Sequence, residues 1–278
     1  MEKSIKTDNY ELYNYDCIEM MDLLIAEGKQ VDLTVTSPPY DDLRSYNNSL
    51  TWNFDVFKRV AQRLYDITKD GGVVVWVVGD KTVKGSESGT SFKQALYFKE
   101  IGFNLHDTMI YEKTNPFGTA GKGHKRYRQS FEYMFILTKG KINTFNPIKE
   151  ECKRKGDSVQ FTTRKNRQSD GLEFDAIRKG ELIVSKEKVL KNIWEYDTGY
   201  NRTTKDKIAF QHPAIFPEKL AQDHILSWSN EGDIVFDCFM GANTTGKMAL
   251  LNNRKFIGIE KVKEYFEISK QRISEYKE

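Results

Sequence analysis

The sequence predicts an α/β fold, in which a doubly wound, Rossmann-like sheet carries a small inserted region. Short runs of β-branched and aromatic residues alternate with segments of helical periodicity, which is the rhythm of βα units. One run, at 73–78, is apolar at every position, as expected of a strand buried on both faces of a parallel sheet. Apolar residues make up 38% of the 278 residues, enough to bury a sizeable core.

The first half of the chain supplies most of the expected elements. Apolar residues at i, i+3 and i+4 spacing predict an amphipathic helix over 53–69, and Gly71-Gly72 is expected to end it. The strands expected here span 10–15, 31–36, 73–78, 105–111 and 130–138, and the other helices span 17–27 and 91–100.

The rhythm stops after residue 138 and resumes near residue 210. Residues 139–191 are polar, strongly charged and poorly periodic, which predicts an inserted small domain or a loop-rich extension. The elements expected beyond it are helices at 218–228, 242–251 and 262–276 and strands at 233–236 and 256–259. We expect the two αβ blocks to form one sheet.

Charge is distributed unevenly along the chain. The formal net charge is only +3, but residues 113–167 hold 14 Lys and Arg against 4 Asp and Glu, a net of +10 that leaves −7 for the rest. This basic block indicates either a surface that binds a polyanion or a solvated lysine-rich face, and charge alone does not choose between them.

Composition excludes several classes of protein. The longest clean apolar run has six residues, far short of the roughly 20 that span a bilayer, so no membrane association is expected. The first residues contain no apolar segment of a secretory signal. Three widely spaced cysteines predict no disulfide framework, and a cytoplasmic location follows. With four histidines and no zinc spacing, no metal site is expected.

A proline pair marks the end of the strand at 31–36. In Thr36-Ser37-Pro38-Pro39-Tyr40 the two prolines fix φ and remove two N–H donors, so the backbone forms a rigid arc of carbonyl acceptors. Such an arc suits a ligand's amino group, and Tyr40 offers a flat face for a planar ring. An ordinary strand-to-loop turn is the alternative, but ligands of open α/β sheets bind at this edge.

The second motif runs from Phe236 to Thr245, as strand, glycine turn and helix. This arrangement presents backbone amides to a ligand, and Thr244 or Thr245 is expected to cap the helix. Only Gly241 is present, so it is a poor dinucleotide fingerprint, and it lacks the Lys-Ser/Thr pair of a P-loop. Taken alone, the segment is better explained as a plain βα turn with an N-cap.

Two acids and one Pro-rich segment complete the candidates. Glu260 ends the strand at 256–259, where it can accept hydrogen bonds from ribose hydroxyls or simply open the next helix, and Asp16 is placed similarly. Pro217 is expected in the first turn of its helix, and Phe216 packs over an adenine ring or acts as a hydrophobic staple. His212 has no Ser/His/Asp partners and is more simply structural.

In combination and order, these motifs resemble the N4-cytosine/N6-adenine DNA amino-methyltransferases of the β arrangement, which use S-adenosylmethionine. Ser37-Pro-Pro-Tyr40 is similar to the family's early [D/N/S]-P-P-[Y/F] motif, and 237–245 to its late D-P-F-x-G-x-G-T-T motif. Residues 212–220, 257–260, 13–16 and 264–273 are similar to further family segments. The chain departs at Cys238, where Pro is usual, and at Asn243, where Gly is usual; Asn tolerates positive φ better than most residues.

The resemblance implies a division of the chain and a set of site residues. It implies a catalytic half at 1–138, a basic target-recognition insert at 139–209 and a cofactor-binding half at 210–278. The catalytic residues implied are Ser37, Pro38, Pro39 and Tyr40. The residues implied to bind S-adenosylmethionine are Asp16, Pro213, Phe216, Asp237, Phe239, Gly241, Asn243, Thr244, Thr245 and Glu260.

The resemblance also implies transfer of a methyl group to the exocyclic amine of a flipped base in double-stranded DNA. Ser in the first motif position leans towards cytosine N4 over adenine N6. The expected DNA-binding residues are Lys125, Arg126, Arg128, Arg154, Arg164, Lys165 and Arg167, with Asn166 and Gln168 as further candidate readers of base edges. A cognate restriction endonuclease, a homodimer and a prokaryotic or phage origin are further expectations.

Three other functions remain open at this point. The same fold serves RNA, protein and small-molecule methyltransferases. A non-catalytic DNA-binding protein with a decayed pocket would explain the altered 237–245 loop. A dinucleotide-dependent oxidoreductase is disfavoured, because the Gly-x-Gly-x-x-Gly pattern is missing.

Overall fold

The computed structural model describes residues 4–39, 52–116, 125–161, 164–168, 171–176 and 180–274. It separates into two compact units: Met1–Asn146 together with Asn192–Glu278, and Pro147–Lys191. The first unit contains the central sheet, and the described part of the second contains small two-stranded sheets. Within the described ranges, no helix is both long and apolar enough to cross a membrane.

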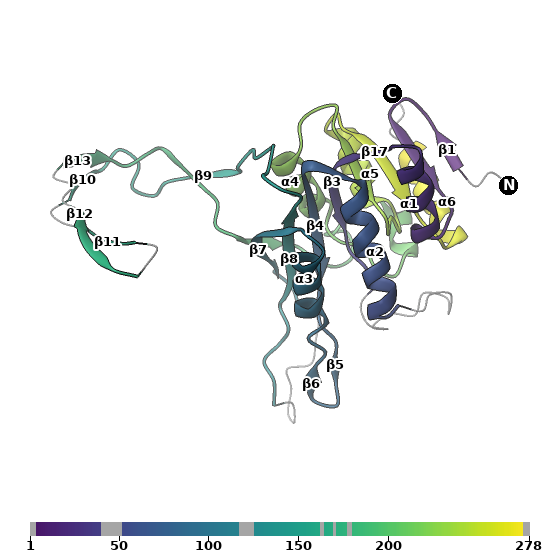
Figure 1. Cartoon of the computed structure of the whole chain (residues 1–278), viewed down its shortest axis with the longest axis horizontal. Helices are drawn as coiled ribbons and strands as arrows, with labels where there is room; N and C mark the ends of the chain where they lie inside the picture. Colours follow the sequence, from purple (N-terminus) through teal and green to yellow (C-terminus); the bar gives the residue numbers. More distant parts are fainter. Residues whose placement is uncertain are drawn as a thin grey trace. The chain divides into compact units, whose positions relative to one another are not determined.

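A nine-stranded sheet forms the centre of the first unit (Figure 1). All its neighbouring strands are parallel, except that β1 and β8 run antiparallel to their neighbours. In spatial order the strands are β1 (Ser4–Lys6), β2 (Tyr10–Tyr13), β17 (Lys255–Ile259), β16 (Ile234–Asp237), β3 (Val31–Thr36), β4 (Thr68–Val78), β8 (Phe131–Thr138), β7 (Asn104–Lys113) and β15 (Ile193–Tyr196).

Helices cover both faces of this sheet, as expected of a doubly wound fold. Helices α1 (Cys17–Ala26), α2 (Phe54–Ile67) and α3 (Thr90–Glu100) pack in one apolar cluster, and α4 (Glu218–Trp228), α5 (Thr244–Leu251) and α6 (Lys263–Ser274) pack against the opposite face. Strand β4 serves both clusters: Val73, Val75 and Val77 join one, while Val74, Trp76 and Val78 join the other. The alternation explains why the 73–78 run is apolar throughout.

The two αβ blocks interleave at the middle of the sheet. Strand β16, from the second block, pairs with β3, from the first. Helix α5 follows β16 and packs on one face of the sheet, whereas α2 follows β3 and packs on the other. Connections that diverge in this way open a crevice at the carboxyl ends of the two strands, which is where open α/β sheets bind ligands.

Helix α2 begins as predicted and ends earlier than predicted. Asn53 is its N-cap, and the Asn53 side chain accepts hydrogen bonds from two backbone N–H groups of the first turn. Gly71-Gly72 does not end the helix: it ends at Ile67, and both glycines lie within β4. Gly71 has φ +80°, and a Cβ there would lie 2.1 Å from the Asn143 side chain, so the glycine permits a close approach of two segments.

The described part of the Pro147–Lys191 unit contains three two-stranded antiparallel sheets, nested one inside the next along the chain. Their pairs are β9 (Lys149–Glu151) with β14 (Glu187–Val189), β10 (Ser158–Phe161) with β13 (Gly180–Ile183), and β11 (Arg164–Arg167) with β12 (Glu173–Ala176). The expected insert at 139–209 is wider than this unit. Its flanks belong to the first unit, where β15 adds a strand to the central sheet.

Candidate active site

A cavity of about 890 Å³ opens at the carboxyl edge of the sheet. Its walls come from the segments that follow β2, β3, β16 and β17, from the facing ends of β7 and β8, and from the chain between β15 and α4. The predicted site residues on its walls are Asp16, Ser37, Pro38, Pro39, Pro213, Phe216, Phe239, Gly241, Thr244 and Glu260. Residues distant in sequence therefore meet in a space large enough for a cofactor and part of a substrate.

The ends of β3 and β16 are joined by a buried hydrogen bond. The Thr36 hydroxyl donates to Asp237 Oδ1 over 2.6 Å, and the same oxygen accepts from the Phe239 backbone N–H at 3.0 Å. Burial raises the pKa of the Asp237 carboxyl to about 6. Asp237 is not a wall residue: it lies behind the cavity and fixes the Ser37-Pro38-Pro39 arc relative to the 238–245 loop.

The 238–245 loop needs two residues in the left-handed region of φ. Gly241 has φ +50°, and a Cβ there would lie 2.9 Å from His212 Nε2, so only glycine fits without displacing the histidine. Asn243 has φ +63°. Asn243 stands where the family usually has a second glycine, and it keeps the left-handed backbone of that position.

The structure corrects the expected helix cap. Asn243, and neither threonine, occupies the N-cap position of α5, and its side chain makes no capping bond. The Thr245 hydroxyl instead donates to the Val35 carbonyl at 3.1 Å, which ties the helix to β3. Like Asp237, Asn243 and Thr245 are buried behind the cavity wall.

Two carboxylates line the opposite end of the same wall. Glu260 accepts from the Gly241 N–H at 2.9 Å and from the Val262 N–H at 2.7 Å, and burial raises its pKa to about 7. Asp16 caps α1 through the Ile18 N–H at 2.9 Å, and its other oxygen lies 3.1 Å from Lys261 Nζ. Each acid therefore orders the backbone and also faces the cavity.

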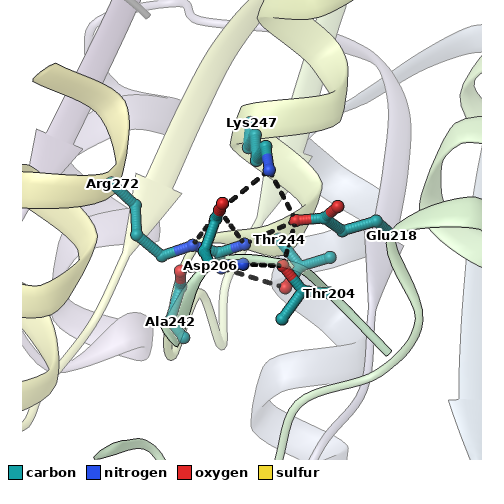
Figure 2. A network of polar contacts seen from close by, with 7 residues as sticks. All are labelled: Thr204, Asp206, Glu218, Ala242, Thr244, Lys247 and Arg272. Atoms are coloured by element: carbon teal, nitrogen blue, oxygen red, sulfur yellow. Dashed lines mark hydrogen bonds and ion pairs between the residues drawn. The ribbon is translucent and has the colours of Figure 1, made fainter. Parts of the chain in front are cut away.

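A buried network of charges supports the loop from behind (Figure 2). Arg272, fully buried on α6, donates to the Ala242 carbonyl and, at 3.2 Å, to the Thr244 hydroxyl. Arg272 and Lys247 both contact Asp206 and Glu218, at 2.7–3.2 Å, and Thr204 donates to Glu218 at 2.6 Å. Two cations and two anions balance, so the cluster links three helices to the loop without a net charge.

Aromatic side chains complete the cofactor end of the cavity. Phe239 meets Trp52 edge-on, with 5.3 Å between ring centroids, and Phe216 stands in the wall before α4. Pro217 occupies the N-cap position of α4, one residue before the helix. His212 Nδ1 accepts from the Ala214 N–H at 3.1 Å, and its ring packs on Tyr265 at 4.3 Å, which is a structural arrangement.

The far end of the cavity contains residues that the motif analysis missed. Lys113, at the end of β7, lies 2.5 Å from Glu132 on β8, and both line the cavity beside Tyr111. Burial, followed by the charge of Glu132, holds the pKa of Tyr111 far above its usual range. The position of Lys113 at a strand's carboxyl end was the available signal, but no motif singled it out.

The remaining predicted residues lie elsewhere or beyond what the structure describes. Tyr40 lies outside the described residues. Lys125, Arg126 and Arg128 are exposed, and Arg126 contacts Glu87 at 3.3 Å. Arg154, in the Pro147–Lys191 unit, is exposed and pairs with Asp157. Arg164, Lys165 and Arg167 belong to β11 of the same unit. Across the described ranges, no group of His, Cys, Asp and Glu side chains is arranged to hold a metal ion.

Comparisons with known proteins identify the family of the chain. The model of a DNA methylase family, the N6/N4 methyltransferases, matches residues 31–271. The orphan methyltransferase M.BamHII of Bacillus amyloliquefaciens is 56% identical over 247 residues, 88% of this chain and 89% of that protein. The DNA adenine methyltransferase YhdJ of Escherichia coli K12 is 26% identical over 88% of this chain and 77% of its own length.

Solved structures show the same fold. The cytosine-N4-specific PvuII DNA methyltransferase superposes with a TM-score of 0.68 at 20% identity, covering 96% of this chain and 87% of that one. The complex of M1.HpyAVI with S-adenosylmethionine superposes with a TM-score of 0.64 at 24% identity, covering 95% and 98%.

The chain belongs to the N6/N4 DNA methylase family. It is a DNA methyltransferase that uses S-adenosylmethionine. The cavity fits this cofactor, because its wall offers acids at Asp16 and Glu260 for a cationic, hydroxyl-bearing ligand and a flat apolar surface at Phe239.

Proposed function

We propose that the chain methylates N4 of a cytosine flipped out of double-stranded DNA, at a specific sequence. The observation that carries this proposal is the bond between Thr36 and Asp237, which places the Ser37-Pro38-Pro39 arc and the 238–245 loop on one cavity. Donor and acceptor of the methyl group would thus meet between two neighbouring strand ends, which the strand pairing, the Thr36–Asp237 bond and the Thr245–Val35 bond hold together.

In the proposed mechanism the protein acts mainly by positioning. The cofactor, when bound, supplies an already activated methyl group. Asp16, Phe239, Gly241 and Glu260 would hold it at the β16–β17 side of the cavity. The Ser37 hydroxyl and the Pro38 carbonyl accept hydrogen bonds from the exocyclic amine, which draws the nitrogen towards tetrahedral geometry and frees its lone pair. These two acceptors would hold the amine in line for methyl transfer, and the proton that the amine releases would pass to solvent water.

The choice of cytosine rests on the motif alone. An exocyclic amine on cytosine or adenine requires the same pair of acceptors, so geometry alone treats them alike. Ser at position 37, in a motif that otherwise starts with Asp or Asn, favours cytosine N4. The target amine lies inside the duplex, so the base must leave the stack to reach the cavity.

The basic block would supply affinity for DNA. The exposed residues Lys125, Arg128 and Arg154, with the Pro147–Lys191 unit, are suited to phosphate contacts. Such contacts release counterions, so log K for DNA should fall steeply and linearly with log salt concentration. The expected homodimer and partner endonuclease remain predictions, and sedimentation of the purified chain tests the first of them.

Methyl transfer by the purified chain tests the proposed function. Labelled S-adenosylmethionine is incubated with the chain and with duplex DNA, single-stranded RNA or free cytidine, over a series of salt concentrations. We expect transfer to duplex DNA alone, decreasing as salt rises. Transfer to RNA or to the free nucleoside at an equal rate, or DNA binding that is insensitive to salt, would contradict the proposal.

A further inference from the structure

The cavity extends well beyond the wall that faces the cofactor. Asp16 and Glu260 line it beside β2 and β17, whereas Lys113 and Glu132 line it at β7 and β8. In the sheet, β3 lies between these two groups of strands, so the Ser37 arc stands between the two ends of the cavity. If the proposed function holds, the β7–β8 end is where the rest of the target base must lie.

The ion pair at this end is not needed to join its two strands. Strands β7 and β8 are already paired from Asn104–Thr138 to Glu112–Phe131, and the Lys113 N–H continues the ladder to Ser130 at 2.7 Å. The side chains of Lys113 and Glu132 are mostly buried, at 24% and 16% exposure. Partly desolvated ion pairs add little net stability, so a function in the cavity explains the pair better.

The hydrogen-bond donors of Lys113 match the acceptors on one edge of the target base. An ammonium group carries three donors, and Glu132 occupies one of them. On cytosine the ring atom next to the amine-bearing carbon is N3, an acceptor, and O2 follows it on the same edge. A base whose amine donates to Ser37 and Pro38 therefore presents acceptors in sequence along that edge.

Lys113 is the best placed of the cationic wall residues. Among the described residues of the wall, the other two are Arg59 and Lys261. Lys261 is bonded to Asp16 at the cofactor end. Arg59 belongs to α2, which packs on the opposite face of the sheet from the cluster that contains Tyr111. Only Lys113 is held by a second wall residue at the β7–β8 end.

We propose that Lys113, held in place by Glu132, donates a hydrogen bond to the ring nitrogen beside the exocyclic amine of the flipped base, and so aligns that base for methylation. This assignment rests on the proposed function. It makes Lys113 a residue that binds the target base and Glu132 a positioning residue.

Kinetics of three variants give the first test. Lys113→Met keeps the aliphatic stem and removes the donors, Glu132→Gln weakens the hold on Lys113, and Arg59→Met removes another cation from the same wall. We expect kcat/KM for DNA to fall about 10- to 100-fold in Lys113→Met, as for loss of one charged hydrogen bond, and less in Glu132→Gln. Affinity for S-adenosylmethionine, measured by calorimetry, should not change in either variant.

A change in the substrate distinguishes recognition from a structural effect. The methylated site is first located by modification-sensitive sequencing of DNA from cells expressing the chain. Duplexes are then made with 3-deazacytosine at the target, which keeps the amine and lacks the ring acceptor. Wild type and Arg59→Met should methylate this DNA more slowly than the cytosine duplex. Lys113→Met should methylate both duplexes at the same rate.

The outcomes separate the two proposals. An equal loss on 3-deazacytosine in wild type and Lys113→Met overturns the role of Lys113 and leaves the proposed function intact. If Arg59→Met instead methylates the cytosine and 3-deazacytosine duplexes at the same rate, the contact belongs to Arg59. If the wild type methylates adenine, the cytosine proposal fails, and the same comparison is made with 1-deazaadenine. If it methylates no DNA, both proposals fail.

Discussion

The two strand ends that form the candidate active site are stiffened in different ways. After β3, the chain gains its rigidity from Pro38 and Pro39, which act through the backbone alone. After β16, the loop has left-handed residues at Gly241 and Asn243 and depends on side chains behind it, above all on Arg272. A short motif can encode the first kind of support, whereas the second needs residues from across the chain.

This difference explains what the sequence could predict. The Ser37-Pro38-Pro39 arc, the α/β architecture and most strands and helices follow from local patterns, and β3 and α4 have the predicted bounds. Strand β15 was missed because it has only four residues and directly follows the polar stretch at 139–191, and its pairing with β7 is what makes it a strand. The cluster of Asp206, Glu218, Lys247 and Arg272 was missed because no spacing connects residues that meet only after folding.

Removal of Arg272 should produce the largest effect on the loop. Arg272→Met leaves Asp206 and Glu218 with one cation instead of two and frees the Ala242 carbonyl. We expect a loss of about 3 kcal/mol in the free energy of unfolding, together with weaker binding of S-adenosylmethionine. Urea unfolding and calorimetry measure the two effects.

Lys270→Met is the matched control, because Lys270 is a more exposed cation on the same helix. It should change stability by less than about 0.5 kcal/mol. If the two variants were equally stable, the network would not support the loop.

Ser37→Ala should affect catalysis and leave the loop unchanged. The variant removes one acceptor of the amine, so kcat should fall about 10- to 100-fold. Binding of S-adenosylmethionine and the unfolding free energy should stay close to those of wild type. Full turnover by Ser37→Ala would show that the reaction does not need the Ser37 hydroxyl.

Glu260 should give cofactor binding a dependence on pH. Because burial raises the pKa of Glu260 to about 7, the ionised carboxylate, which we propose accepts ribose hydroxyls, is gained as pH rises. Affinity for S-adenosylmethionine should rise from pH 6 to pH 8, by at most about tenfold per unit below the pKa.

The contribution of Glu260 to stability has the opposite sign. It is fully present below the unfolded pKa of about 4.5 and is lost as pH rises through about 7, because the folded state binds the proton more tightly. Glu260→Gln should flatten both profiles, and a pH-dependent affinity that survived in this variant would point to another group.

Asn243→Gly should have the smallest effect, and in the stabilising direction. Asn243 has a left-handed backbone, and both polar atoms of its buried side chain lack a hydrogen-bond partner in the described part of the chain. Glycine removes the strain of the left-handed backbone and the two buried polar atoms. The unfolding free energy should therefore rise by about 1 kcal/mol.

Asn253→Gly is the control, because Asn253 has nearly the same φ, +62°, and an exposed side chain. It removes only the backbone strain and should therefore have a smaller effect than Asn243→Gly. Equal shifts in the two variants would mean that the buried amide of Asn243 costs nothing.

The identity of the methylated nucleoside tests the central claim most directly. DNA from cells that express the wild-type chain or Ser37→Ala is digested to nucleosides, which are separated and weighed. The account predicts N4-methylcytosine in the wild-type sample and far less of it in the variant. N6-methyladenine in its place, or no methylated nucleoside above the level in cells that lack the chain, would contradict it.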